Sequence, residues 1–168
     1  MKSLVQIGAG KIGRSFTAQV FGRAGYRVVF VDIDQLLVDA LNARGSYEVY
    51  FLGENTETFQ ISQVSALHAS QEQRVQREIS EADIVCVSVG KSAVPGITGL
   101  LAGGLTRRWQ MHGARPLDII LADGAGALYE REIRLWDGHD LTFTGKAIKP
   151  DQFKVEKIMN GKKDTMNK

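Results

Sequence analysis

The sequence predicts an α/β fold in which a doubly wound, mostly parallel β-sheet carries helices on both faces. Short apolar runs that suit buried strands alternate with stretches whose apolar residues recur about every fourth position, as on one face of a helix. Between the first such strand and the first such helix, three glycines have the spacing Gly-x-Gly-x-x-Gly, at Gly8, Gly10 and Gly13. In that context the spacing is typical of a Rossmann-like βαβ unit that binds a dinucleotide.

The first βαβ unit runs to Asp32. Residues 2–7 form the expected first strand, and residues 12–24 form the expected first helix. Gly25 can end this helix because glycine adopts the left-handed conformation at little cost. Residues 27–32 are the expected second strand.

The glycine turn predicts a site for a pyrophosphate. Gly8 would make the tight turn, Gly10 would let the backbone approach the phosphates, and Gly13 would let the helix pack closely on the strand. The free N–H groups at the start of the helix carry roughly half a positive charge, which favours an anion. The cofactor contacts expected in this turn are Gly8, Ala9, Gly10, Lys11, Ile12, Gly13 and Arg14.

Asp32 predicts which dinucleotide is bound. It stands at the carboxyl end of the second strand, where an acid accepts hydrogen bonds from the ribose hydroxyls of adenosine and repels a 2′-phosphate. NAD is therefore favoured over NADP. Ile33 is a further expected contact, and Arg14 and Arg44 are the arginines that could approach from elsewhere to bind an extra phosphate.

The middle of the chain continues the alternation, with one interruption. Asp34 would cap a helix that Gly45 ends, and residues 47–64 indicate a small antiparallel β insert around a polar turn. Ser70 begins a Ser-x-x-Gln capping box before a polar helix. Residues 82–90 form the next expected strand.

The end of that strand should reach the cofactor, because ligands lie at the carboxyl ends of strands in a doubly wound sheet. Val89 and Gly90 are the expected contacts there. Pro95 suits the first turn of a further helix, which has Arg107 and Arg108 near its end, where cations complement the helix dipole. Residues 117–121 are the next expected strand.

Composition excludes several classes of function. With 21 basic and 19 acidic side chains the net charge is only +2, which gives no reason to expect nucleic acid or an anionic membrane as partner. We expect a cytoplasmic protein, because no apolar run approaches the roughly 20 residues of a membrane span and no secretory signal is evident.

The single cysteine, Cys86, lies in an apolar strand and is expected to be a core residue. His68, His112 and His139 lack the spacing of a metal site, so no metal is expected.

Four segments of the chain carry a more specific pattern: Gly8-Ala9-Gly10-Lys11-Ile12-Gly13-Arg14-Ser15-Phe16, Leu41-Asn42-Ala43-Arg44-Gly45-Ser46-Tyr47, Val87-Ser88-Val89-Gly90 and Pro116-Leu117-Asp118-Ile119-Ile120. Together they resemble the N-terminal part of mannitol-1-phosphate 5-dehydrogenases, a group within the polyol-specific long-chain mannitol dehydrogenase family. The resemblance is more specific than the glycines alone, because the Leu-Asn-Ala-Arg stretch has no generic cofactor role.

The resemblance implies an oxidoreductase that transfers hydride between NAD and a sugar alcohol or its phosphate, such as mannitol 1-phosphate. It implies an NAD-binding Rossmann domain over residues 1–126, with Asp123 where the family holds the nicotinamide and the substrate. The family's catalytic lysine lies in a helical domain, in a Lys-x-x-x-x-Asn-x-x-His pattern. Lys157 and Asn160 do not complete this pattern, so the catalytic residue stays unknown and we expect the catalytic domain to be missing from this chain.

Residues 127–168 are expected to form a short C-terminal α+β extension that packs on the Rossmann domain or forms an arm. Residues 129–136 indicate an amphipathic helix, and residues 141–144 and 153–156 indicate short strands. Residues 160–168 are expected to be a flexible basic end.

Three explanations of the length stay open. The chain is a domain of a longer enzyme, a natural short form that acts with a partner subunit, or a non-catalytic module that senses NAD or NADH. Sensing modules of this kind normally work as dimers, here a homodimer, or as larger rings. A glycine turn that serves only as scaffold and binds no nucleotide is a further alternative. The expected ligand besides NAD is a small polyol or sugar phosphate.

Overall fold

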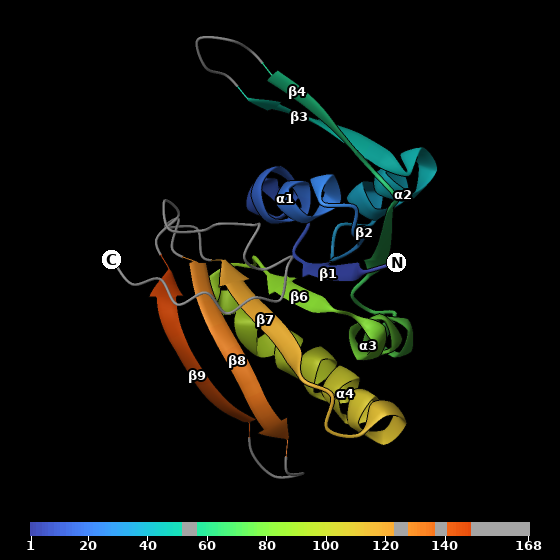
Figure 1. Ribbon diagram of the computed structural model, residues 1–168. Coiled ribbons are helices and arrows are strands. Elements are labelled where there is room, and N and C mark those ends of the chain that lie inside the picture. The colour runs from blue at the N-terminus through green and yellow to red at the C-terminus, as the bar shows by residue number, and fades with distance from the viewer. Residues whose placement is uncertain (52–56, 123–127, 137–140, 149–168) are drawn as a thin grey trace, which may run out of the picture.

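The main sheet has the predicted α/β architecture. The computed structural model describes residues 1–51, 57–122, 128–136 and 141–148. Within these residues, seven strands form one sheet in the order β5-β2-β1-β6-β7-β8-β9 (Figure 1). The first five pair in parallel and the last two are antiparallel. In chain order the parallel strands are arranged 3-2-1-4-5, as in a Rossmann fold.

The elements follow the predicted alternation closely. The first half of the chain supplies β1 (Ser3–Ile7), β2 (Arg27–Asp32), α2 (Gln35–Arg44) and β5 (Val64–His68). The second half supplies α3 (Glu72–Glu81), β6 (Ile84–Val87), α4 (Val94–His112) and β7 (Leu117–Ala122). The first helix starts at residue 11, passes through a π-helical turn (Gly13–Thr17) and continues as α1 (Ala18–Arg23).

The two faces of the sheet bury separate apolar clusters. Leu4 and Phe30 lie in the cluster on the side of α1 and α2, whereas Val5 and Ile79 lie in the cluster on the side of α3 and α4. Cys86 is fully buried in the first cluster, and this burial confirms its predicted place in the core. Burial also raises the pKa of its thiol. Among the described helices, none has the length and hydrophobicity needed to cross a membrane.

The predicted β insert is a separate hairpin. Its strands, β3 (Ser46–Phe51) and β4 (Glu57–Ser62), pair only with each other and pass over α1 (Figure 1). Ile61 of β4 is almost fully buried, and a Cβ built on Gly22 of α1 would lie 2.5 Å from its Cγ2 atom. The guanidinium of Arg23 lies 3.6 Å from the centre of the Phe59 ring, which adds a cation–π contact.

The insert is shorter than predicted, because Val64 does not belong to it. Gln63 has a φ angle of +58°, and this left-handed residue ends the hairpin. Its carbonyl accepts the N–H of Val28 at 3.1 Å, and the chain then continues as β5 in parallel with β2. The predicted insert thus included the start of β5, and this strand of the parallel sheet was not predicted.

Two more local predictions were wrong. The capping box at Ser70 does not form, because α3 begins at Glu72 after Gln71, and Ser70 instead contacts His68. The stretch expected to be helical at residues 129–136 is a strand, β8 (Leu128–Trp136). It pairs with the outer edge of β7, so a long-range backbone ladder overrides the local helical pattern.

The strand predicted at residues 141–144 is confirmed and longer, as β9 (Leu141–Ile148), which pairs with β8. The C-terminal extension is therefore β-structured in its described part. Asp123, the strand expected at residues 153–156 and the basic end at 160–168 lie outside the described residues. The division of the chain at residue 126 stays a prediction.

The outer edge of β5 is occupied by the chain itself. The N–H of Ala66 donates to Asn42 Oδ1 at 2.8 Å, and Asn42 Nδ2 donates to the Ala66 carbonyl at 2.9 Å. The N–H of Val64 donates to the Gly45 carbonyl at 3.1 Å. A carboxamide offers the same donor and acceptor as a peptide group, so Asn42 stands in for a neighbouring strand. This contact gives a structural role to the Leu-Asn-Ala-Arg stretch.

We expect Asn42→Ala to lower the free energy of unfolding by about 1–2 kcal/mol, measured by urea denaturation. Both backbone groups of the buried Ala66 lose a partner, and the better helix propensity of alanine offsets part of that loss. The matched control is Gln35→Ala, which removes an exposed amide from the same helix and should change stability by less than about 0.5 kcal/mol. Equal effects of the two variants would contradict the assigned role of Asn42.

Candidate functional site

The glycine turn lies at the carboxyl end of β1, next to the point where the strand order reverses between β1 and β6. Gly8 has a φ angle of +91°, and a Cβ atom there would lie 2.6 Å from the Ser88 carbonyl oxygen. A Cβ on Gly13 would lie 2.0 Å from the Gly8 carbonyl oxygen. These two glycines therefore have the structural roles predicted for them, the tight turn and the close packing of the helix.

Gly10 differs from the other two glycines, because a Cβ built on it would meet no atom of the described residues within 4 Å beyond its immediate chain neighbours. The first backbone hydrogen bond of the helix joins the Arg14 N–H to the Gly10 carbonyl at 3.0 Å. The preceding N–H groups thus form the positive end of the helix, as at any helix start. Lys11 is exposed beside them, and Ile12 packs partly against the core. The backbone at Gly10 has room for a ligand.

Asp32 faces this turn from the end of β2. Its Oδ2 atom accepts the Ala9 N–H at 2.6 Å, and its Oδ1 atom accepts the Asp34 N–H at 3.0 Å. Each carboxylate oxygen can accept a second hydrogen bond, so both remain able to bind ribose hydroxyls. The side chain of Ile33 is 81% exposed beside it. Asp32 therefore combines a structural contact with free acceptor capacity.

His68 fixes the backbone that follows Asp32. The two residues are partners in the register of β2 and β5. The Ser70 N–H donates to Nδ1 of His68 at 3.2 Å, so Nε2 carries the proton and donates to the Ile33 carbonyl at 2.9 Å. This contact could not be predicted from the sequence, because only the pairing of β2 with β5 brings His68 to this place.

A buried polar network lies under the glycine turn. Gln6 near the end of β1 is fully buried, and its Nε2 atom lies 2.8 Å from Ser88 Oγ and 3.2 Å from the Gly8 carbonyl oxygen. Its Oε1 atom accepts the hydroxyl of Thr17 in the π-helical turn. Sequence analysis did not identify these residues. The one available signal was an amide inside an otherwise apolar strand.

The hairpin also reaches the first helix at this site. The hydroxyl of Tyr47 donates to the carbonyl of Arg14 at 2.8 Å, within the π-helical turn. Burial raises the pKa of Tyr47 because desolvation disfavours the phenolate, while the nearby Arg14 cation acts in the opposite direction. The phenol therefore keeps its proton and remains a donor to the helix backbone.

The other predicted contacts are placed less centrally. Val89 lies near the turn, with its Cγ1 atom 3.0 Å from a Cβ built on Gly8, and Gly90 is exposed after β6. The guanidinium of Arg14 donates to the Ala9 carbonyl and so lies on the turn. Arg44 is the last residue of α2 and lies roughly 13 Å along the helix axis from Gln35, the first residue of that helix. Its side chain therefore cannot reach Asp32.

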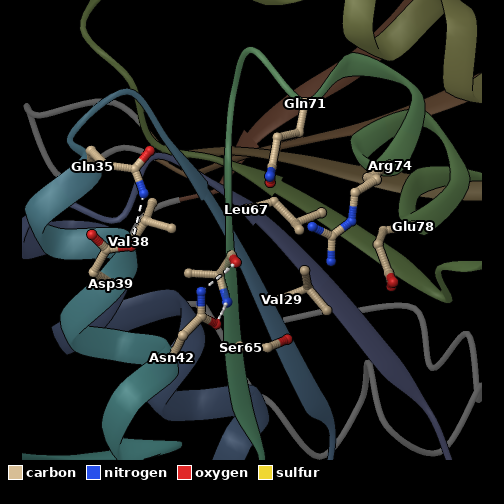
Figure 2. Close-up of a pocket in the computed structure, with 11 residues that line it drawn as sticks. Val29, Gln35, Val38, Asp39, Asn42, Ser65, Leu67, Gln71, Arg74 and Glu78 are labelled. Atoms are coloured by element: carbon tan, nitrogen blue, oxygen red, sulfur yellow. Dashed lines mark hydrogen bonds between the residues drawn. The ribbon is translucent and has the colours of Figure 1, made fainter.

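A groove of about 300 Å³ lies along the outer edge of β5, between α2 and α3 (Figure 2). In Figure 2, Asn42 reaches from α2 to the strand through its two hydrogen bonds, while Gln71, Arg74 and Glu78 line the opposite wall. None of the predicted cofactor contacts that the structure describes lines this groove. It is therefore separate from the glycine turn.

The geometry of the turn fits a dinucleotide. Open backbone at Gly10 and the positive end of a helix suit a diphosphate, and Asp32 beside them suits a ribose. The exposed apolar side chain of Ile33 follows Asp32 directly in the chain. The acid and the glycine turn are joined directly, through the bond between Asp32 and Ala9.

Comparison with known proteins gives consistent matches over the same part of the chain. The family described as the mannitol dehydrogenase Rossmann domain matches residues 2–127. Mannitol-1-phosphate 5-dehydrogenase of Anoxybacillus flavithermus is 39% identical over 120 residues, which are 71% of this chain and 31% of that protein. The enzyme of the same name from Caldanaerobacter subterraneus is 33% identical over 163 residues, 95% of this chain and 42% of that protein. The chain thus spans less than half the length of these curated relatives.

A solved structure also resembles the chain. Yeast methylglyoxal/isovaleraldehyde reductase Gre2, complexed with NADPH, is 15% identical, with a TM-score of 0.43 over 71% of this chain and 37% of that chain. A similarity at this level carries no argument about function.

Proposed function

Because the chain belongs to the mannitol dehydrogenase family through its Rossmann domain, we propose that it binds NAD at the glycine turn. We propose further that it presents the cofactor for hydride transfer to or from a sugar alcohol phosphate. The observation that carries the proposal is the direct contact of Asp32 with the glycine turn, beside the open backbone of Gly10. The relatives named mannitol-1-phosphate 5-dehydrogenase favour mannitol 1-phosphate as the polyol.

The diphosphate of the cofactor would lie against the first turn of the first helix. The N–H groups there precede the helical ladder, and their dipoles favour a negative charge. Gly10 supports this placement because, in the part of the chain that the structure describes, no side chain occupies the space beside its backbone. Lys11 is exposed at the same helix start and would add positive charge.

The adenosine would lie between the ends of β2 and β6. Asp32 would accept hydrogen bonds from the ribose hydroxyls with the free lone pairs of both carboxylate oxygens. Ile33 is exposed where the adenine would need an apolar surface. Val89 and Gly90 would border the cofactor from the neighbouring strand end.

The hydride chemistry belongs to the nicotinamide cofactor, and the protein contributes binding and orientation. In this proposal the described residues hold the diphosphate and the adenosine. We assign no catalytic residue to the described part of the chain. Because the matched segment is only 31–42% of the length of the relatives, turnover of a polyol phosphate by this chain alone is a separate question from cofactor binding.

Titration with NADH and with NADPH, followed by nucleotide fluorescence, tests the proposal. We expect NADH to bind and NADPH to bind at least about tenfold more weakly, because the Asp32 carboxylate would repel the 2′-phosphate. ADP-ribose should compete with NADH, since it carries the diphosphate and the adenosine ribose. Absence of NADH binding would overturn the proposed site, and equal affinity for NADPH would overturn the preference for NAD.

A further inference from the structure

We propose that Gln6 is a positioning residue that holds the glycine turn in the conformation needed to bind a diphosphate. The inference rests on the proposed function, since it concerns the same cofactor. It gives a role in cofactor binding to the buried amide of Gln6, which lies in β1, outside the glycine motif.

The orientation of the Gln6 amide is fixed by its neighbours. Its Nε2 atom lies 3.2 Å from the carbonyl oxygens of both Ile7 and Gly8, which can only accept hydrogen bonds. The Oε1 atom therefore faces Thr17, whose hydroxyl can donate to it. Ser88 Oγ lies 2.8 Å from Nε2 and donates in turn to the Gly8 carbonyl at 3.1 Å. Each polar atom of the amide thus has a partner.

This network holds one end of the peptide unit that joins Gly8 to Ala9. The carbonyl of that unit accepts from Gln6 and from Ser88, while its N–H donates to Asp32 at 2.6 Å. The three side chains come from β1, from the segment after β6 and from β2. A rotation of this peptide plane would break the contacts at both ends. Its orientation sets the direction of the backbone that enters Gly10 and the helix start.

The helix itself also rests on the network. A Cβ built on Gly13 would lie 2.9 Å from Ser88 Oγ and 3.2 Å from Gln6 Nε2, so Gly13 packs directly over both groups. Thr17, one turn further on, bonds to Gln6 from inside the π-helical turn. The Gln6 amide therefore fixes the start of the first helix relative to the glycine turn, and the diphosphate would bind between these two parts.

An apolar side chain at position 6 would fill the space without replacing these contacts. Leu4, two residues earlier in β1, is on the same face and is fully buried in the apolar cluster. A buried amide is costly unless its hydrogen bonds are made, so packing alone does not explain Gln6. The contacts at the turn do explain it.

The test compares two ligands in the full chain carrying Gln6→Met, a substitution that keeps length and removes the hydrogen bonds. We expect the dissociation constant of NADH, from fluorescence titration, to rise roughly tenfold. Binding of adenosine, followed by NMR shifts, should change less than about twofold, because adenosine has no diphosphate. If the substitution only destabilised the sheet, the affinities for NADH and for adenosine should fall by the same factor. That result would overturn the positioning role.

Val5→Ala is the matched control, because Val5 is fully buried next to Gln6 in β1 but faces the other side of the sheet. It should lower the melting temperature and leave the NADH affinity of the folded protein unchanged. Ser88→Ala supplies a second variant should Gln6→Met fail to fold, with an expected rise of about fivefold in the NADH dissociation constant. In the double variant, the dissociation constant of NADH should rise by less than the product of the two single rises, because both side chains act on the same carbonyl.

The outcomes separate the two claims. If the unmodified chain does not bind NADH, the proposed function is overturned, and this inference with it. If the unmodified chain binds NADH and both Gln6→Met and Ser88→Ala bind it equally well, the positioning role of Gln6 is overturned while the proposed function stands. A selective loss of NADH over adenosine supports the inference.

Discussion

Replacing Arg108 by methionine is expected to lower the free energy of unfolding by about 3 kcal/mol, because it removes one donor group from several buried acceptors. Arg108 lies in α4 with only 3% of its surface exposed. Its guanidinium donates to four backbone carbonyls at 2.8–3.0 Å, those of Ser80, Ala82, Arg115 and Pro116. It thereby joins the end of α3 and the segment before β7 to α4.

The carbonyls at the end of α3 explain the size of this effect. The last carbonyls of a helix lack partners within the helix, and Arg108 supplies donors to Ser80 and Ala82 there. Desolvation lowers the pKa of Arg108, and the nearby Arg115 cation acts in the same direction, while Asp83 and Glu81 oppose them. Burying this cation is costly, so the four hydrogen bonds must outweigh a real penalty.

Urea denaturation checks this prediction, with Arg107→Met as the matched control. Arg107 is the preceding residue of the same helix, but it is exposed, so its replacement should change the free energy of unfolding by less than about 0.5 kcal/mol. Equal stability of the two variants would show that the four contacts of Arg108 contribute nothing net. The free energy of unfolding of Arg108→Lys should lie between those of Arg108→Met and Arg107→Met, since one ammonium group cannot reach all four carbonyls.

Asp32→Ala is expected to weaken NADH binding about a hundredfold, the largest effect on the proposed site. The variant loses the carboxylate acceptors for the ribose and also the contact that holds the Ala9 N–H. Charge-assisted hydrogen bonds of this kind are the stronger class. The measurement is a fluorescence titration with NADH on protein shown to be folded by circular dichroism.

Asp34→Ala is the matched control for Asp32, because it removes a carboxylate two residues away. The side chain of Asp34 caps α2 by accepting the N–H groups of Leu36 and Leu37. Its loss should cost about 1 kcal/mol of stability and leave NADH affinity unchanged. Asp32→Asn adds a test of the charge. A neutral side chain should narrow the difference between the dissociation constants of NADH and NADPH. Unchanged NADH binding in Asp32→Ala would contradict the ribose assignment.

Features set by neighbouring residues could be predicted from the sequence. The turn at Gly8 and the helix that Asp34 begins and Gly45 ends depend on backbone conformation and on side chains a few residues apart. The alternation of apolar runs was enough to predict four of the five parallel strands, all except β5. The place of Asp32 at the end of β2 followed from the same pattern, because a strand and its end are local features.

Features set by distant pairing could not be predicted in this way. Arg107 and Arg108 have the same chemistry, and only the rotation of α4 against α3 makes one a surface residue and the other a buried donor. Gln6 and Ser88 lie far apart in the chain and meet because β1 and β6 are neighbours in the sheet.

The contact between Asn42 and Ala66 has a consequence for self-association. Two subunits can join through a continuous intermolecular sheet only where an outer strand has unoccupied peptide groups. At β5 a second copy would first have to displace the Asn42 carboxamide from both polar groups of Ala66. A dimer of this chain that leaves these bonds intact therefore cannot extend the sheet through Ala66 of β5.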